Sequence, residues 1–221
     1  MGEWVKWVHE NSFCSVCAVP FIHPLPSMRL CFASNNAHKL DEIRPLLPAG
    51  LELLSLADIG CAEELPETQD TLEGNALQKA RYVWENYGVP CFADDTGLEV
   101  AALHGAPGVH SAHYAGPQRR AEDNVAKLLQ ALHDTADRSA RFRTVVALVG
   151  LGADEQLFAG AVAGHIAGAP RGEGGFGYDP VFVPAEGDGR SFAEMNLAEK
   201  KGLSHRARAV AGLVSQLKIM N

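Results

Sequence analysis

The chain has 221 residues, of which 47% are hydrophobic and 21% charged, a composition typical of one globular domain or of two lobes that share a core. Its net charge of -8 argues against a nucleic-acid polymer or an anionic membrane as partner, because both attract basic surfaces. No apolar run approaches the roughly 20 residues that a membrane-spanning helix needs, so we expect no membrane partner either.

Residues 1–27 differ from the rest of the chain, since they lack periodicity and hold two tryptophans and three prolines. We expect a loosely ordered N-terminal extension here and a working domain over residues 28–221. Cys14 and Cys17 have C-x-x-C spacing, but no second pair follows, so neither a zinc site nor a redox site is expected. The other three cysteines, Cys31, Cys61 and Cys91, are scattered, which indicates reduced thiols in a cytoplasmic protein.

Apolar residues predict a buried strand over 29–33 and a helix from Leu40 to Leu47, which Pro48 and Gly50 end. The segment between them therefore lies at a helix N-terminus, where free N–H groups and the helix dipole favour phosphate. Its residues are Ser34, Asn35, Asn36, Ala37, His38 and Lys39. We favour anion binding here over a simple asparagine N-cap, which would explain only one of the two asparagines. No Walker loop occurs in the chain.

The next stretch predicts a strand over 51–56, an acidic loop over 63–70, and a helix that begins at the N-cap Thr71 and runs to about Tyr87. Gly88 and Pro90 end this helix. Acidic loops are usually only solvated, so the pattern alone singles out no glutamate in it.

Residues 91–98 carry two adjacent carboxylates, Asp94 and Asp95, at the predicted end of a buried strand. Thr96 and Gly97 read as the turn that ends the strand, with a second strand over 98–103. Two neighbouring carboxylates repel each other, and a bound cation or a shared proton would relieve that repulsion. The alternative is an aspartate-rich turn that caps its own backbone.

The middle of the chain predicts a tight turn over 105–109, a helix over 121–133, and a hairpin of strands over 141–149 and 156–162, which makes the sheet mixed. His104, His110 and His113 lack a ligand spacing such as H-x-x-x-H. We therefore expect polar-pocket or solvent-facing histidines here and no zinc site.

A glycine-rich stretch over 170–180 matches G-x-G-x-x-G at Gly172, Gly174 and Gly177, but it precedes a strand over 181–183 where a dinucleotide fold needs a helix. One interpretation is a loop that presents Phe176 and Tyr178 for stacking on a base. The alternative is a hairpin loop whose aromatic rings pack inward.

The last predicted helix is capped by Ser204 and runs to about Leu217. Lys200, His205 and Arg206 lie at or before its N-terminus, although cations usually prefer the other end of a helix. Their position indicates a nearby anion or polar ligand, unless they are only surface charges.

Four of these stretches together resemble the inosine/xanthosine triphosphate pyrophosphatase family, whose members are also called Ham1-like proteins. The stretches are residues 34–39, 93–98, 174–180 and 204–206, and residues 105–108 and 140–142 fit as well. The resemblance runs from about Met28 to the C-terminus. It implies an α/β fold with a mixed twisted sheet, flanking helices and two lobes around a central nucleotide-binding cleft, usually in a homodimer.

The resemblance also implies a Mg²⁺-dependent hydrolase that converts dITP, ITP and XTP to the monophosphate and pyrophosphate, which removes deaminated purines from the nucleotide pool. By position, Asp95 matches the catalytic acceptor, and Glu67 and Asp95 match the metal ligands. The positions that match substrate contacts are Ser34, Asn35, Asn36, Ala37, His38, Lys39, Thr96, Phe176, Gly177, Tyr178, Asp179, Lys200, His205 and Arg206. Which of Asp94 and Asp95 holds metal and which activates water is left open.

The chain departs from the family pattern at a few positions. Gln69 stands in place of a common glycine and Gly74 in place of a frequent glutamate, while His110 and His113 replace a tyrosine and an arginine. Three other functions stay open at this point: a pyrophosphatase for pyrimidine nucleotides, a non-catalytic nucleotide sensor, and an NAD-binding protein.

Overall fold

The computed structural model describes residues 28–220. The extension expected over residues 1–27, with Cys14 and Cys17, lies outside the described residues.

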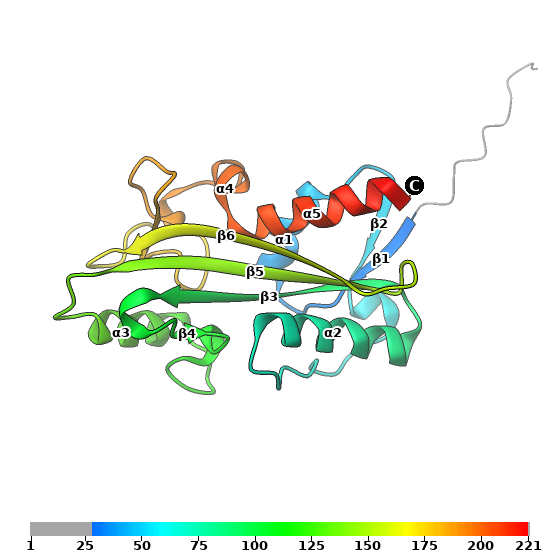
Figure 1. Ribbon diagram of the computed structural model, residues 1–221, viewed down its shortest axis with the longest axis horizontal. Helices are drawn as coiled ribbons and strands as arrows, with labels where there is room; N and C mark the ends of the chain where they lie inside the picture. Colours follow the sequence, from blue (N-terminus) through cyan, green and yellow to red (C-terminus); the bar gives the residue numbers. More distant parts are fainter. Residues whose placement is uncertain (1–27, 221) are drawn as a thin grey trace, which may run out of the picture.

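A seven-stranded mixed sheet forms the centre of the molecule, with strand order β2-β1-β3-β5-β6-β7 and with β4 paired to β3 (Figure 1). β1 is parallel to β2 and β3, and the other pairs are antiparallel. The sequence thus predicted a mixed sheet correctly. The strands are β1 (Met28–Phe32), β2 (Leu51–Leu54), β3 (Cys91–Val100), β4 (Pro107–Gly108), β5 (Ser139–Val149), β6 (Gln156–Ile166) and β7 (Phe182–Pro184).

Helices cover both faces of this sheet (Figure 1). On one side lie α1 (Ala37–Ile43), α4 (Leu197–Leu203) and α5 (His205–Met220), and on the other lie α2 (Leu72–Tyr87) and α3 (Ala121–Ala131). Short 3₁₀ turns occupy Arg44–Leu46, Ala57–Ile59, Ala101–Leu103, Ser111–His113 and Phe192–Glu194. No helix of residues 28–220 is both long and apolar enough to cross a membrane.

Helix α2 shows how the sequence directs this packing. Thr71 caps it by accepting a hydrogen bond from the Gly74 N–H, and Gly88, with φ of 65°, ends it in the left-handed conformation that glycine favours. Its buried residues recur at helical spacing and face β3 and β5; they are Leu72, Asn75, Ala76, Lys79, Ala80 and Val83.

The apolar core falls into two parts along the sheet, which agrees with the predicted two lobes. At one end, side chains from β1 and the first half of β3 pack between α2 on one face and α5 on the other. At the other end, Leu98 and Val100 of β3 pack with α3 and with an aromatic group of Phe142, Phe182 and Phe192.

The predicted turn at Thr96 and Gly97 is wrong, because β3 runs unbroken from Cys91 to Val100. Gly97 serves a different purpose: a Cβ atom there would lie 2.6 Å from the Gly108 carbonyl oxygen, so only glycine lets β4 approach so closely. The second strand predicted over 98–103 is therefore the end of β3 followed by the 3₁₀ turn Ala101–Leu103.

One edge of β3 is open in its middle. β1 pairs with it only at Cys91 and Phe92, and β4 pairs with it only at Leu98 and Glu99. Within the described chain, residues 93–97 therefore have a ladder partner on the β5 side alone. The two aspartates lie in this gap.

Candidate active site

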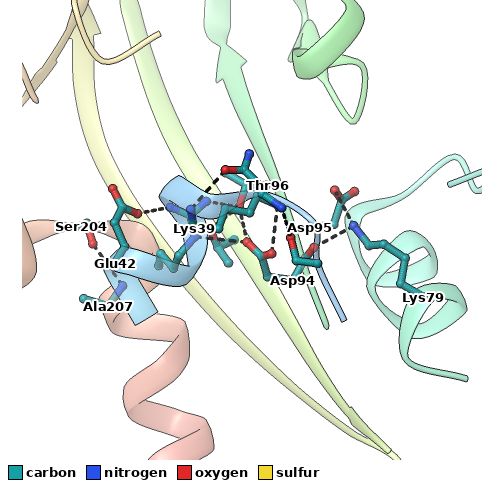
Figure 2. Close-up of polar contacts among 12 residues, drawn as sticks. Lys39, Glu42, Lys79, Asp94, Asp95, Thr96, Ser204 and Ala207 are labelled. Carbon is teal, nitrogen blue, oxygen red and sulfur yellow. Dashed lines mark hydrogen bonds and ion pairs between the residues drawn. The ribbon is translucent and has the colours of Figure 1, made fainter. Parts of the chain in front are cut away.

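Asp94 and Asp95 point to opposite faces of the sheet because successive side chains of a strand alternate. Asp94 faces Lys39 of α1, whereas Asp95 faces Lys79 of α2 (Figure 2). Arg206 of α5 also lies against Asp94. The two carboxylates therefore belong to different environments, although they are neighbours in sequence.

Asp94 is fully buried and held by two cations. Lys39 Nζ lies 2.9 Å from one carboxylate oxygen and Arg206 Nε lies 3.2 Å from the other. Burial opposes ionisation, but the charges of Lys39 and Arg206 outweigh it and hold the pKa of Asp94 well below its usual range. Asp94 is therefore a permanent anion at neutral pH whose oxygens are both occupied.

A chain of alternating charges continues from Arg206 toward the glycine-rich loop. Arg206 pairs with Glu42 of α1, Glu42 lies 2.5 Å from Lys200 Nζ, and Lys200 lies 2.7 Å from Asp179. The side chains of Glu42, Lys200, Arg206 and Asp179 are each at least 90% buried. These carboxylates explain why buried cations gather near the start of α5, a placement that the sequence alone left open.

Thr96 extends the Asp94 side of the site. Its hydroxyl lies 2.7 Å from the hydroxyl of Thr144 on β5 and 3.3 Å from Asp94, and it accepts a hydrogen bond of 3.2 Å from Arg206. Since a carboxylate only accepts and a guanidinium only donates, the single proton of Thr96 goes to Asp94. Thr144 therefore donates to Thr96, so the fully buried Thr144 fixes the orientation of the Thr96 hydroxyl.

Asp95 lies in a less saturated environment. Asn75 of α2 donates to it at 3.2 Å, and Lys79 Nζ lies 3.5 Å away. Lys79 also lies 2.5 Å from Glu67 and donates to the Asp94 carbonyl oxygen at 2.8 Å. Burial raises the pKa of Asp95 above its usual value, and the nearby charge of Glu67 adds to the rise, while Lys79 opposes it.

Asn75 and Lys79 are two polar contacts that the sequence prediction missed, as it did Glu42 and Thr144. Asn75 and Lys79 are one helical turn apart and lie within the buried stripe of α2. A polar residue on an apolar helical stripe was therefore a usable signal. Glu42 lies one position before the buried Ile43 and one turn after Lys39, which is a much weaker signal.

The predicted phosphate segment lies where the sequence placed it, between β1 and α1. Asn36 is the N-cap and accepts from the Lys39 N–H at 3.2 Å, while Ser34 accepts from the Asn36 N–H at 3.2 Å. Asn35, Ala37 and His38 are exposed. The N-cap interpretation therefore holds for Asn36, and anion binding at the exposed residues beside it stays a prediction.

The two aromatic residues of the glycine-rich loop have different surroundings. Tyr178 is buried in the core, and its hydroxyl donates to the Ser111 carbonyl at 3.0 Å, so the inward-packing alternative describes it. Phe176 is half-buried, stacks on His38 with ring centroids 5.4 Å apart, and lies within 5.5 Å of the charged ends of Lys200 and Arg206. Next to it, Gly177 takes the left-handed conformation with φ of 62°.

Asp179 closes this loop on itself by accepting from the Phe176 N–H at 2.8 Å. Gly175 makes this closure possible, since a Cβ atom there would lie 2.2 Å from the Asp179 carboxylate. Burial raises the pKa of Asp179, and Lys200 opposes that rise. Asp179 thus fixes the loop and anchors Lys200 at the same time.

His205 carries the one buried side-chain nitrogen or oxygen atom of residues 28–220 that lacks a hydrogen-bond partner, Nδ1. Burial, together with the charges of Arg206 and Lys200, holds the pKa of His205 well below its ordinary value, so the ring is neutral at neutral pH. It stacks on Phe142 with centroids 4.6 Å apart. A neutral imidazole with a free ring nitrogen is suited to a polar ligand group.

The residues on the Asp95 side suit Mg²⁺. Glu67 and Asp95 share one ammonium group, so two carboxylates converge on a small region that already attracts positive charge. Mg²⁺ binds through one or two carboxylates together with phosphate oxygens and water, and this pair supplies that number of protein ligands.

Comparison with known proteins gives a consistent result. A sequence model described as the Ham1 family matches residues 30–216. The dITP/XTP pyrophosphatase of Porphyromonas gingivalis is 56% identical over 186 residues, which cover 84% of this chain and 95% of that protein. The dITP/XTP pyrophosphatase of Flavobacterium johnsoniae is 50% identical over 190 residues, which cover 86% and 98%.

Solved structures share the fold. The Ham1 protein of Staphylococcus aureus superposes with a TM-score of 0.80 at 34% identity, over 87% of this chain and 100% of that chain. A nucleoside-triphosphatase / dITP/XTP pyrophosphatase of Mycobacterium abscessus has a TM-score of 0.69 at 44% identity, over 85% and 99% of the two chains.

Proposed function

The chain belongs to the Ham1 family and is a nucleoside-triphosphate pyrophosphatase, and we propose that it hydrolyses dITP, XTP and ITP to the monophosphate and pyrophosphate. One observation carries the proposed chemistry: the two neighbouring carboxylates of β3 are held differently, with Asp94 saturated by Lys39 and Arg206 and Asp95 left with a raised pKa.

This difference supports separate roles for the two aspartates. A general base needs a free oxygen and a pKa raised toward the working pH, and Asp95 meets both needs better than Asp94. Asp95 takes the proton of the attacking water, which adds to the α-phosphorus while pyrophosphate leaves. Asp94 positions Lys39 and Arg206 for the nucleotide.

We propose that Glu67 and Asp95 hold Mg²⁺, which when bound supplies positive charge to the phosphate oxygens. Lys79 contacts both carboxylates and donates to the Asp94 carbonyl, so it holds Glu67 close to β3, beside Asp95. Displacing the Lys79 ammonium from one carboxylate leaves an oxygen free for the ion.

The triphosphate would lie along residues 34–39, where exposed backbone N–H groups and Lys39 face it. Burial lowers the pKa of Lys39, and the neighbouring charges of Lys79 and Arg206 add to this, while Asp94 opposes it. A phosphate group beside Lys39 favours its charged form, so substrate binding and protonation of Lys39 support each other. Lys39 then offsets charge on the departing pyrophosphate.

We propose that the purine stacks on Phe176 and presents its 6-position to His205 and Arg206. Hypoxanthine and xanthine carry a 6-oxo acceptor, which suits the Arg206 donors, whereas adenine carries a 6-amino donor that would repel them. A site built on such donors rejects the wrong edge by roughly 10⁴-fold or more. The Nδ1 atom of His205 has no hydrogen-bond partner within the described residues, so it can bind the purine without breaking an existing hydrogen bond.

Three further expectations belong to this proposal. The enzyme acts on small purine nucleotides to remove deaminated bases from the pool, it works as a homodimer, and it works in the cytoplasm. The free thiols of Cys31, Cys61 and Cys91 support the last of these, because cytoplasmic proteins keep their cysteines reduced.

The test is a pyrophosphate-release assay on ITP, dITP, XTP, dUTP and TTP, with and without Mg²⁺. We expect turnover of the first three nucleotides only, and only with Mg²⁺. Preference for dUTP or TTP would overturn the substrate assignment in favour of a pyrimidine pyrophosphatase. Binding of ITP without Mg²⁺-dependent turnover would indicate a nucleotide sensor instead.

A further inference from the structure

A pair of histidines flanks the 3₁₀ turn Ser111–His113: His110 precedes the turn as its N-cap, and His113 is its last residue. His110 Nδ1 is 3.3 Å from His113 Nε2, and the two rings meet edge to face with centroids 5.3 Å apart. Both residues are exposed. The two imidazoles therefore face each other at the surface of the turn and are open to an ion from solution.

The local backbone explains why these rings meet. The His113 N–H donates to the His110 carbonyl at 3.1 Å, which closes a 3₁₀ turn, and residues three apart are eclipsed on such a turn. The absence of H-x-x-x-H spacing would matter on an α-helix, where residues four apart share a face. On a 3₁₀ turn, H-x-x-H is the spacing that brings two imidazoles together.

The turn itself is firmly anchored. Ser111, between the two histidines, is buried; its hydroxyl donates to the Gly108 carbonyl at 2.6 Å and accepts from the Leu98 N–H at 2.9 Å. Its carbonyl accepts from the Tyr178 hydroxyl at 3.0 Å. The floor of the turn is thereby tied both to β3 and to the glycine-rich loop.

Asn124 of α3 fixes the far side of the turn. Its side chain donates to the Ala112 carbonyl at 3.0 Å and accepts from the Ala115 N–H at 2.6 Å, and it is buried. Because the backbone under the histidines is held at both ends, little ordering entropy remains to be lost when an ion joins their side chains.

We propose that His110 and His113 form a two-histidine site for a borderline divalent transition metal such as Zn²⁺, Ni²⁺ or Cu²⁺. Two nitrogens bound tetrahedrally to Zn²⁺ at about 2.0–2.1 Å lie about 3.4 Å apart, close to the separation of the two ring nitrogens here. Rotation of the exposed rings about χ2, a broad torsion, aims both lone pairs at one point. Water completes the coordination.

The chemistry of the two sites keeps their ions apart. Neutral imidazole suits Zn²⁺, Ni²⁺ and Cu²⁺, whereas Mg²⁺ prefers carboxylate oxygens such as those of its proposed ligands Glu67 and Asp95. Within residues 28–220 no cluster of three or more histidines, cysteines, aspartates or glutamates can hold a metal ion. The histidine site therefore keeps open positions for water and exchanges its ion. This inference goes beyond the proposed hydrolysis and does not rest on it.

The test measures Zn²⁺ binding to the full chain by calorimetry, with Mg²⁺ saturating and with Cys14→Ser and Cys17→Ser present, because a C-x-x-C pair can bind Zn²⁺ by itself. We expect one Zn²⁺ per chain, at least about tenfold weaker binding in His110→Gln and in His113→Gln, and unchanged binding in His165→Gln, an exposed histidine on β6. The chain with only the two cysteine changes is the parent, and the three histidine variants are made in it. Equal affinity in these four proteins, or no binding in the parent, would overturn the proposal.

Thermal unfolding gives a second measurement. An ion that binds only the folded chain raises the unfolding midpoint, so Zn²⁺ should raise it for the parent and for His165→Gln but not for the other two variants. A rise that persists in His110→Gln and His113→Gln would likewise overturn the proposal. The midpoints without Zn²⁺ should agree among all four proteins, since the exchanged side chains are exposed.

Discussion

The two sides of β3 differ in how completely their charges are balanced. On the side of α1 and α5, the three cations Lys39, Arg206 and Lys200 alternate with the three carboxylates Asp94, Glu42 and Asp179. On the side of α2, the single cation Lys79 faces the two carboxylates Asp95 and Glu67. We call these the balanced side and the deficient side.

This comparison shows how one dipeptide serves two purposes. The period of two along a strand sends Asp94 to the balanced side, where it is a structural anion, and Asp95 to the deficient side, where it keeps a raised pKa. The deficient side has one positive charge fewer than it has carboxylates, and a bound divalent cation would supply positive charge there. The following predictions test this division, from the largest expected effect to the smallest.

The largest effect is expected for Asp95→Asn on the deficient side. The variant should fold, since Asn75 can still donate to the amide oxygen, but it should lose about 10³-fold or more of its ITP hydrolysis, in the range that general-base catalysis contributes. Pyrophosphate release measures the loss, and circular dichroism checks the fold. Retention of most of the activity would refute the assignment of Asp95 as base.

On the balanced side, Asp94→Asn should mainly lower the stability of the fold. Asp94→Asn leaves Lys39 and Arg206 buried with one carboxylate fewer, so we expect a loss of about 3–5 kcal/mol in the free energy of unfolding. Urea unfolding of both variants makes the comparison. If Asp94→Asn and Asp95→Asn were equally stable, the distinction between the two sides would fail.

The aromatic residues of the glycine-rich loop offer a smaller contrast. Phe176→Ala should raise KM for ITP about tenfold, because stacking on a base contributes about 1–3 kcal/mol, and should lower stability less. Tyr178→Phe is the control, since it removes only the hydroxyl bonded to Ser111 and should leave KM unchanged. Collapse of folding in Phe176→Ala would show instead that this ring packs as core.

Thr144 tests the positioning of Thr96 on the balanced side. Thr144→Val keeps the shape but removes the proton that Thr96 accepts, so we expect about 1 kcal/mol lower stability and a several-fold lower kcat/KM. Thr144→Ser restores the hydroxyl and should recover kcat/KM. Failure of serine to do so would mean that the methyl group, and not the hydrogen bond, matters.

The pH dependence of kcat/KM gives the finest test. Without Mg²⁺ the pKa of Asp95 is raised, so protons compete with the ion for this carboxylate; at limiting Mg²⁺, activity should therefore begin to fall at a higher pH than an ordinary aspartate would give. Lys79→Gln should move this acid limb further upward, since the Lys79 charge lowers the pKa of Asp95, whereas Lys218→Gln should not move it. A limb that moved downward in Lys79→Gln would contradict the described coupling.

Acid should also lower the free energy of unfolding, and it should do so through the other aspartate, Asp94. The pKa of Asp94 is depressed in the folded chain, so its ion pairs stabilise the fold above the pKa of the unfolded chain and lose this effect as pH falls through the folded value.

The sequence predicted the mixed sheet and the order of the elements, because apolar periodicity and glycine and proline punctuation determine these locally; the set of segments that form the site followed from the resemblance to the family. It placed the end of β3 wrongly, because Gly97 marks the close approach of β4 and not a turn. That difference depends on a contact between residues distant in sequence.

For the same reason, the sequence did not predict which side chains of the site pair with one another. The residues around Glu42 do not predict that it lies between Lys200 and Arg206, which are more than 150 positions away in the sequence. Lys79 was closer to recognition, since a lysine on a buried helical stripe needs a carboxylate partner. The direction of Tyr178 depended on the distant carbonyl of Ser111 and was not predictable from the loop.

The open edge of β3 has a consequence for association of chains. Unpaired strand edges invite other strands to add and so promote aggregation. Here β1 blocks the edge up to Phe92 and β4 blocks it from Leu98, so a foreign strand has no room to extend in either direction. The gap is wide enough for a side chain, as Lys79 shows by donating to the Asp94 carbonyl, but it is too short for another strand, so this open edge carries little of the usual risk of aggregation.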